Sequence, residues 1–186
     1  MGVERPELSE SQRDFIERSP MFFMATAPSG SQGHVNCSPR PVDWTFFVDT
    51  SRCVGWFDLV GSGIETIAHI KENGRIVLMF CSFGPKPLIL RIHGYGTVFE
   101  PGDHVFESRL SSAANPTGIR AVVTVDIERV STSCGYGVPL MDFISHRPTI
   151  GEWIEKKGDQ GLLEYRRKNN LVSVDGLPGL ESGKLR

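Results

Sequence analysis

The sequence lacks the features that mark membrane proteins and nucleic-acid-binding proteins. No apolar run approaches the roughly 18 residues that a helix needs to cross a bilayer. Its 20 Lys and Arg are balanced by 22 Asp and Glu, for a net charge of -2, so no basic excess indicates binding to nucleic acid. The segment from Met1 to Glu10 is polar and acidic, unlike a secretory signal peptide. We therefore expect a cytoplasmic protein with neither a membrane nor a nucleic-acid partner.

Metal-binding motifs and common catalytic motifs are also missing. Four cysteines, at positions 37, 53, 81 and 134, form no CxxC pair, and the five histidines are scattered. This pattern predicts reduced, mostly buried thiols and no metal site. The chain has no GxSxG elbow, no paired-carboxylate pattern and no convincing Ser-His-Asp or Cys-His set. If the protein is an enzyme, a cofactor therefore carries the chemistry.

What the sequence does contain is a succession of short strand patterns. Its 186 residues include no obvious linker, so we expect one domain spanning residues 1–186. The 20 Gly and 12 Pro favour many turns. Their order and short connections predict a mainly β fold, an antiparallel barrel or sandwich with added helices. Six or seven strands are predicted, at 21–27, 34–40, 44–48, 53–59, 75–81, 88–99 and 120–130, with the longest signal at 88–99.

Helical spacing is found near both ends and once in the middle. We expect a short helix at 9–18, where Ser9 or Ser11 supplies the N-cap. A central helix begins near Ile64, and Asn73-Gly74 resembles its C-cap. Another short helix is predicted at 103–110. The C-terminal third forms a helical extension at 149–157 and 160–169, followed by a turn-rich, extended tail from 171 to 186.

The segment that leads into the central helix has the composition of a phosphate cradle. A strand ends, the turn Gly61-Ser62-Gly63 follows, and a helix begins. The first turn of a helix presents unpaired N–H groups and the positive end of the helix dipole, while Ser62 and Thr66 add hydroxyl groups. The alternative is a tight turn in which Ser62 caps the helix and no ligand binds.

A second polar motif lies on the strand predicted at 34–40. Alternation places Asn36, Ser38 and Arg40 on one face of this strand. Arginine can bind a phosphate with two hydrogen bonds, and polar groups on a half-buried face need partners. The alternative is an edge strand whose polar face meets solvent.

Several of these motifs together resemble the pyridoxamine 5'-phosphate oxidase-like family. The resemblance lies in MFFMATAP at 21–28, HVNCSP at 34–39, GSGIETIAH at 61–69 and ENGRIVLMF at 72–80. Segments 132–139 and 173–179 resemble an uncharacterised subgroup of that family. The resemblance implies a six-stranded antiparallel split barrel of the FMN-binding type. It also implies a homodimer that binds FMN in clefts between the subunits and acts on a small molecule.

The resemblance also implies which residues hold the cofactor. The phosphate end of FMN would meet the strand that includes Arg40, which stands where the true oxidases carry a lysine, and the turn before the central helix. We predict a set of seven cofactor-binding residues, namely Asn36, Ser38, Arg40, Asp58, Ser62, Gly63 and Thr66.

Departures from the true oxidases leave the activity open. Glu65-Thr66 stands where the oxidases open the central helix with an Arg-Lys pair, and the C-terminus lacks their Arg-rich, Trp-containing segment. We therefore do not expect pyridoxamine phosphate as substrate. The first hypothesis is an FMN-dependent oxidoreductase. The second is a binding protein without turnover, for haem or flavin. The third is a deazaflavin-dependent reductase, ranked below FMN because few Lys and Arg lie near the predicted cleft.

Overall fold

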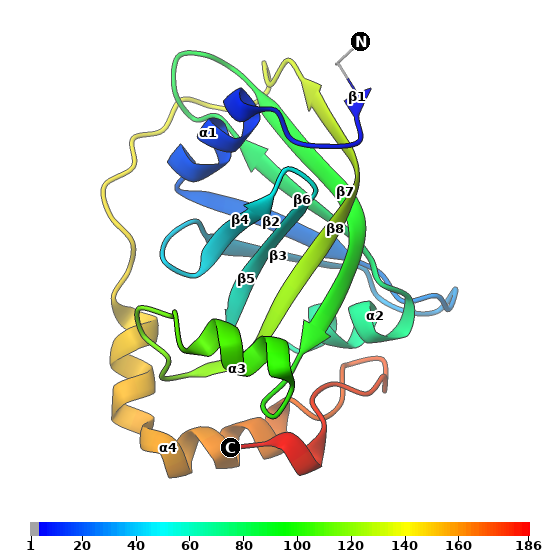
Figure 1. Cartoon of the computed structure of the whole chain (residues 1–186), viewed down its shortest axis with the longest axis vertical. Coiled ribbons are helices and arrows are strands. Elements are labelled where there is room, and N and C mark those ends of the chain that lie inside the picture. Colours follow the sequence, from blue (N-terminus) through cyan, green and yellow to red (C-terminus); the bar gives the residue numbers. More distant parts are fainter. Residues whose placement is uncertain (1–3) are drawn as a thin grey trace.

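The computed structural model describes residues 4–186, in which one curled antiparallel sheet dominates (Figure 1). The strand order β3-β2-β6-β7-β8-β5-β4, with β1 paired to β8, is mainly β and of the expected split-barrel type. The described residues form eight strands, whereas six were expected from the family. The strands are β1 (Glu4–Arg5), β2 (Met21–Thr26), β3 (Asn36–Pro41), β4 (Phe46–Thr50), β5 (Cys53–Leu59), β6 (Arg75–Cys81), β7 (Ile89–Phe99) and β8 (Ile119–Ser133).

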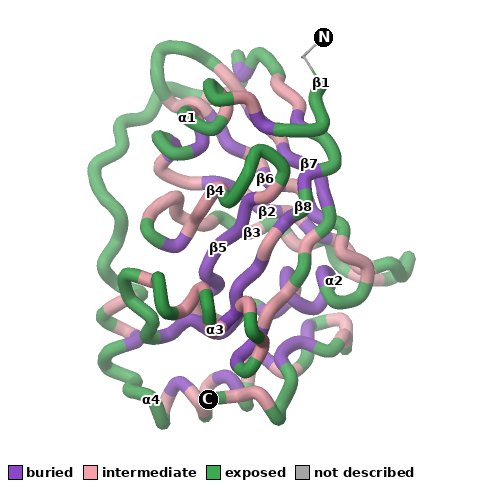
Figure 2. Tube along the Cα trace, in the orientation of Figure 1, coloured by how far each residue is buried: buried purple, intermediate pink, exposed green. Residues whose placement is uncertain are grey.

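Alternating apolar residues put the core on the inner face of the curled sheet (Figure 2). In β2 the side chains of Phe22, Met24 and Thr26 are buried, while the residues between them are only half-buried. Phe22 stacks on Phe80 of β6 and meets Trp56 of β5 edge to face. These aromatic contacts join strands that are distant in sequence, so they close the sheet around one core.

Two of the strand predictions were wrong in their details. The longest strand is β8 with 15 residues, not β7 with 11. The short strand β1 was missed because two residues carry no alternation. Gly94 explains an irregularity between β7 and β8, since a Cβ there would overlap the backbone oxygen of Asp126, where the strand register shifts.

Four helices and one 3-10 turn flank the sheet in residues 4–186. They are α1 (Glu10–Arg18), α2 (Glu65–Asn73), α3 (His104–Leu110), α4 (Thr149–Asn169) and η1 (Ser182–Lys184). Ser9 caps α1 in a capping box with Gln12, and Gly74 ends α2 with a φ of 73°. Gly158 interrupts α4 with a φ of 62°, so the two C-terminal helices predicted from the sequence meet at a kink.

The C-terminal segment folds back over α2 instead of extending into solvent (Figure 1). Leu180 is buried against Ile64 and Ile67. The Lys71 ammonium donates a 2.7 Å hydrogen bond to the backbone oxygen of Gly179. These contacts place the tail beside the start of α2, which is where the phosphate cradle was predicted.

The sequence also predicted that no helix would cross a membrane and that the cysteines would be reduced and mostly buried. Among residues 4–186, no helix is both long and apolar enough to span a bilayer. All four cysteines are free thiols. Only Cys81 is buried, whereas Cys37 and Cys134 are exposed, so the expectation of mostly buried thiols was wrong.

Candidate functional site

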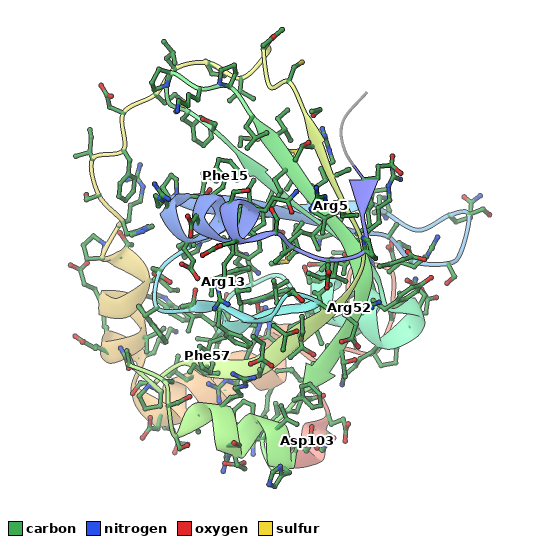
Figure 3. All side chains as sticks on the ribbon, turned by 45° about the horizontal axis from the view of Figure 1, so that its top comes forward. Arg5, Arg13, Phe15, Arg52, Phe57 and Asp103 are labelled. Carbon is green, nitrogen blue, oxygen red and sulfur yellow. The ribbon has the colours of Figure 1, made fainter. Side chains whose placement is uncertain are left out.

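A cavity of about 480 Å³ opens between β3 and the start of α2. Its apolar side includes Phe57 of β5, which lies on the side of the sheet that α3 covers (Figure 3). Alternation along β3 turns every second side chain toward it. Six of the seven predicted cofactor-binding residues line this cavity, namely Asn36, Ser38, Arg40, Ser62, Gly63 and Thr66. Two separate motifs of the sequence therefore meet at one place.

The seventh predicted residue, Asp58, does not line the cavity. In β5 the neighbours Phe57 and Leu59 face the cavity, so alternation turns Asp58 to the opposite side. The side chain of Asp58 is 2% exposed. It accepts hydrogen bonds from Arg120 Nε at 2.8 Å, Trp56 Nε1 at 3.3 Å and Arg40 Nη2 at 3.5 Å. Asp58 is thus a buried anchor for the site's two arginines.

The charge of Asp58 follows from these neighbours. Burial raises the pKa of its carboxyl, whereas the Coulomb attraction of Arg120 and of Arg40 and the hydrogen bonds from Arg120 and Trp56 lower it. The favourable contacts prevail, so the pKa of Asp58 lies below its usual value of 3.8. Asp58 is therefore ionised at neutral pH and keeps both guanidinium groups in place.

Arg120 is a functional residue that the sequence analysis missed. Its side chain is 2% exposed and donates to Gly61 O at 3.0 Å and Gly63 O at 2.6 Å, in addition to Asp58. These bonds fix the shape of the turn before α2. A signal was available, because one arginine in the otherwise apolar run Ile119–Val123 must have a partner.

The turn held by Arg120 lines the cavity and has unused backbone donors. Within residues 4–186, no protein group accepts a hydrogen bond from the backbone N–H of Gly61, Ser62 or Gly63. Ser62 does not cap α2, as the alternative interpretation had it, since the N-cap is Ile64 and has no side-chain hydrogen bond. Free N–H groups at a helix N-terminus are a favourable place for an anion.

Glu65 supplies a negative charge at the same helix end. Its Oε2 accepts a 3.0 Å hydrogen bond from Ile64 N, and its Oε1 lies 3.4 Å from Val174 N of the C-terminal tail. The carboxylate therefore takes donors that would otherwise face a ligand, and it repels a second anion. Any anion that enters this cavity needs a cation to offset Glu65.

Arg40 is that cation. Its side chain is 30% exposed, and its bonds to Asp58 Oδ1 at 3.5 Å and to Pro39 O at 3.2 Å leave the rest of its five N–H groups free for a ligand. Of the residues that line the cavity, Arg40 and Arg120 are the ones that carry positive charge. Since Arg120 is already fully engaged by Asp58 and the turn, Arg40 is placed to hold an anion.

A second cavity, of about 560 Å³, adjoins the first and shares Pro39, Arg40 and Pro41 with it. Its outer wall is the strap, residues 134–148, which runs down one side of the molecule between β8 and α4 (Figure 1). The strap is exposed along most of its length (Figure 2). It carries a series of exposed large apolar side chains, at Tyr136, Leu140, Met141, Phe143 and Ile144.

The curled antiparallel sheet, with a cavity between an outer strand and the start of the helix after β5, defines a split-barrel protein. Residues 8–134 match the family model for pyridoxamine 5'-phosphate oxidase. The chain is 39% identical over 198 residues to the pyridoxamine 5'-phosphate oxidase family protein ustO of Aspergillus flavus, covering 98% of this chain and 79% of that one. The chain therefore belongs to the pyridoxamine 5'-phosphate oxidase family.

Solved structures support the fold assignment. HupZ of Group A Streptococcus has a TM-score of 0.55 and 19% identity, over 71% of this chain and 98% of its own. A Clostridium acetobutylicum protein related to general stress protein 26, of the pyridoxinephosphate oxidase family, has a TM-score of 0.50 and 13% identity, over 75% and 94%. Identities this low establish the shared fold and nothing about the ligand.

Proposed function

We propose that the protein is an FMN-dependent oxidoreductase of its family and that the phosphate of FMN binds at Arg40. The observation that carries this proposal is the position of Arg40. Its guanidinium has free donors, and it lines the same cavity as the turn Gly61–Gly63 with its unused N–H groups. A cation and backbone donors that face one space are the usual way to hold a phosphate.

The lining residues fit this cofactor in size and chemistry. A volume of about 480 Å³ lies in the range of small-molecule sites. Arg40 binds the anion, the turn N–H groups and the Ser62 hydroxyl donate to it, and Phe57 offers an apolar surface. Bound FMN would supply the redox chemistry, and the residues that line the cavity would position it. The small-molecule substrate is left undefined by these residues.

The strap supports the further proposal that the protein is a homodimer. Its exposed apolar side chains include Met141 and Phe143, which line the second cavity together with Arg40, and the neighbouring Leu140 and Ile144. A surface of this kind is unfavourable in water and favourable against a second copy. Light scattering tests this proposal, and a monomer at micromolar concentration contradicts it.

The free thiols support the further proposal of a cytoplasmic location.

Glu65 favours a second candidate function, a binding protein without turnover. A carboxylate at the α2 N-terminus weakens phosphate binding there. Under this alternative the cavity holds haem or sequesters a flavin. A deazaflavin ranks lower, since its longer anionic tail needs more cations than Arg40 and Arg120 supply.

The visible absorption spectrum of the purified protein decides between these candidates. The spectrum is recorded as isolated, then after addition of excess FMN and removal of unbound ligand. Retained flavin bands that an added electron donor bleaches support the oxidoreductase. A Soret band after haem titration, without retained flavin, supports the haem-binding protein instead.

A further inference from the structure

His69 of α2 is a buried histidine that the proposed function does not use. It is 0% exposed. Its Nδ1 lies 3.0 Å from the hydroxyl oxygen of Thr26. Its Nε2 is buried and has no hydrogen-bond partner among residues 4–186. A buried ring nitrogen without a partner is uncommon, because the loss of hydration is not offset.

A chain of hydrogen bonds connects His69 to the wall of the first cavity. The Ser38 hydroxyl donates to Asn36 Oδ1 at 3.0 Å, and Asn36 Nδ2 donates to Thr26 Oγ1 at 3.1 Å and to Thr66 Oγ1 at 2.8 Å. The Thr26 hydroxyl accepts from the Asn36 amide, and among residues 4–186 His69 Nδ1 is the acceptor within reach of its own hydrogen, so Thr26 donates to His69 Nδ1. His69 therefore carries its proton on Nε2, the nitrogen that has no partner.

This direction of the chain has a consequence in the cavity. The hydrogen of the Ser38 hydroxyl points inward to Asn36, so its oxygen meets the cavity with lone pairs alone. Lone pairs repel the oxygens of a phosphate. In its present direction the chain therefore disfavours an anion next to Ser38.

The same side chains can form a chain in the opposite direction, in which the Thr66 hydroxyl turns from Met24 Sδ to donate to the Asn36 carbonyl. His69 then holds its proton on Nδ1 and donates to Thr26, Thr26 donates to the Asn36 carbonyl after the amide turns over, and the amide N–H donates to Ser38. The Ser38 hydrogen becomes free to point into the cavity. His69 gives one proton from Nε2 to water and takes one from water at Nδ1, so its charge is unchanged. Nε2 becomes a bare acceptor instead of an unpaired N–H.

We propose that His69 is a positioning residue whose tautomer sets whether Ser38 presents a lone pair or a donor to the ligand. In the free protein the proton lies on Nε2, and an anion beside Ser38 moves it to Nδ1. This inference rests on the proposed function, in which the anion is the phosphate of FMN.

The first experiment needs no ligand. The ¹⁵N chemical shifts of His69, assigned by loss of its signals in His69→Phe, distinguish a bare ring nitrogen from a protonated one. Wild type is expected to have the proton on Nε2. A carboxylate at position 36 only accepts, so Asn36→Asp makes Thr26 donate to it and is expected to move the proton to Nδ1. Asn115→Asp, an exposed control, is expected to leave the tautomer unchanged. An unchanged tautomer in Asn36→Asp overturns the proposal.

The second experiment adds the ligand. Saturating FMN is expected to move the proton to Nδ1, whereas riboflavin, which lacks the phosphate, leaves it on Nε2. Ser38→Ala and His69→Phe each weaken FMN binding about tenfold, as for one hydrogen bond to a charged group, and the double variant loses no more than either single variant. Bound FMN with an unchanged tautomer overturns the inference. Failure to bind FMN overturns the proposed function instead, and Asn36→Asp still decides the role of His69.

Discussion

The Arg120 guanidinium and the Asp58 carboxylate form a buried ion pair, with Nε and Oδ2 2.8 Å apart and both side chains 2% exposed. The pair links β8 to β5 underneath the first cavity. Through its other two nitrogens Arg120 also holds the carbonyls of Gly61 and Gly63. One buried contact therefore serves both the sheet and the shape of the turn.

Removal of Arg120 is expected to destabilise the protein strongly. In Arg120→Met the Asp58 carboxylate stays buried without its main partner, which costs about 3–5 kcal/mol of the free energy of unfolding. Denaturant unfolding measures the loss. The control is Arg129→Met, whose exposed ion pair with Glu4 contributes less than about 1 kcal/mol. Equal losses in the two variants would contradict the anchoring role of Asp58 and Arg120.

The same ion pair makes the free energy of unfolding depend on pH. The pKa of Asp58 is lowered in the folded protein, so the carboxylate stabilises the fold above its unfolded value of 3.8 and loses this effect as the pH falls through its folded value. Asp58→Asn removes the charge at every pH. We expect the difference in unfolding free energy between wild type and Asp58→Asn to be largest near neutral pH and to shrink below pH 3.8. A difference that is constant from neutral to acidic pH excludes this linkage.

His34 and Asp175 tie the β2–β3 hairpin to the C-terminal tail, with Nδ1 and Oδ1 2.6 Å apart. The hydrogen bond that His34 donates to Asp175, and the charge of that carboxylate, raise the pKa of His34, and the hydrogen bonds from the His34 ring and backbone lower the pKa of Asp175. Because the pKa of His34 is raised in the folded protein, protonated His34 stabilises the fold fully below pH 6.5. This stabilisation is lost as the pH rises through the pKa of His34 in the folded protein. The Asp175 carboxylate stabilises the fold above pH 3.8, and this stabilisation is lost as the pH falls through the lowered pKa of Asp175. The contact is therefore strongest between these two values.

An NMR titration checks this contact directly. In Asp175→Asn the pKa of His34 is expected to fall back toward its usual 6.5, because the acceptor charge is gone. Strand β3 of the hairpin lines the first cavity, and the same variant reports whether the hairpin and the tail are joined in solution. An identical titration curve for His34 in wild type and Asp175→Asn would show that they are not.

Gly94 gives a test of the sheet itself. A side chain at this position would overlap the Asp126 backbone, so Gly94→Ala must push β7 and β8 apart at their register shift. We expect a loss of about 1–3 kcal/mol of unfolding free energy, as for overpacking in a core. Gly84→Ala has nothing within 4 Å of the new methyl group and is the matched control. Thermal unfolding of the two variants compares them, and an unaffected Gly94→Ala contradicts the close approach.

Local patterns of the sequence predicted much of the fold. Alternation in β2 and the Gly74 cap of α2 are properties of short segments, so they could be found without the structure. The meeting of Arg40 with the turn at Gly61–Gly63 was predicted because the family resemblance joined two separate motifs. Local spacing alone does not bring them together.

The missed parts of the site depend on pairing between distant residues. Arg120 and Asp58 are 62 residues apart, and His34 and Asp175 are 141 apart, so no window along the chain contains either pair. Asp58 was assigned to the cofactor because its motif was treated as one unit. The alternation within β5, which turns Asp58 away from the cavity, becomes evident once the pairing partners of that strand are known.

We propose above all that the first cavity binds FMN through a phosphate held by Arg40, and a titration tests this binding most directly. Quenching of flavin fluorescence gives the affinities of wild type, Arg40→Gln and the control Arg52→Gln, in the β4–β5 turn, for FMN and riboflavin. Loss of a charged hydrogen bond, about 1.5–3 kcal/mol, predicts that Arg40→Gln weakens FMN binding roughly 10- to 150-fold, while its riboflavin affinity stays the same. Equal FMN affinity in wild type and Arg40→Gln, or no FMN binding by wild type, would contradict the claim.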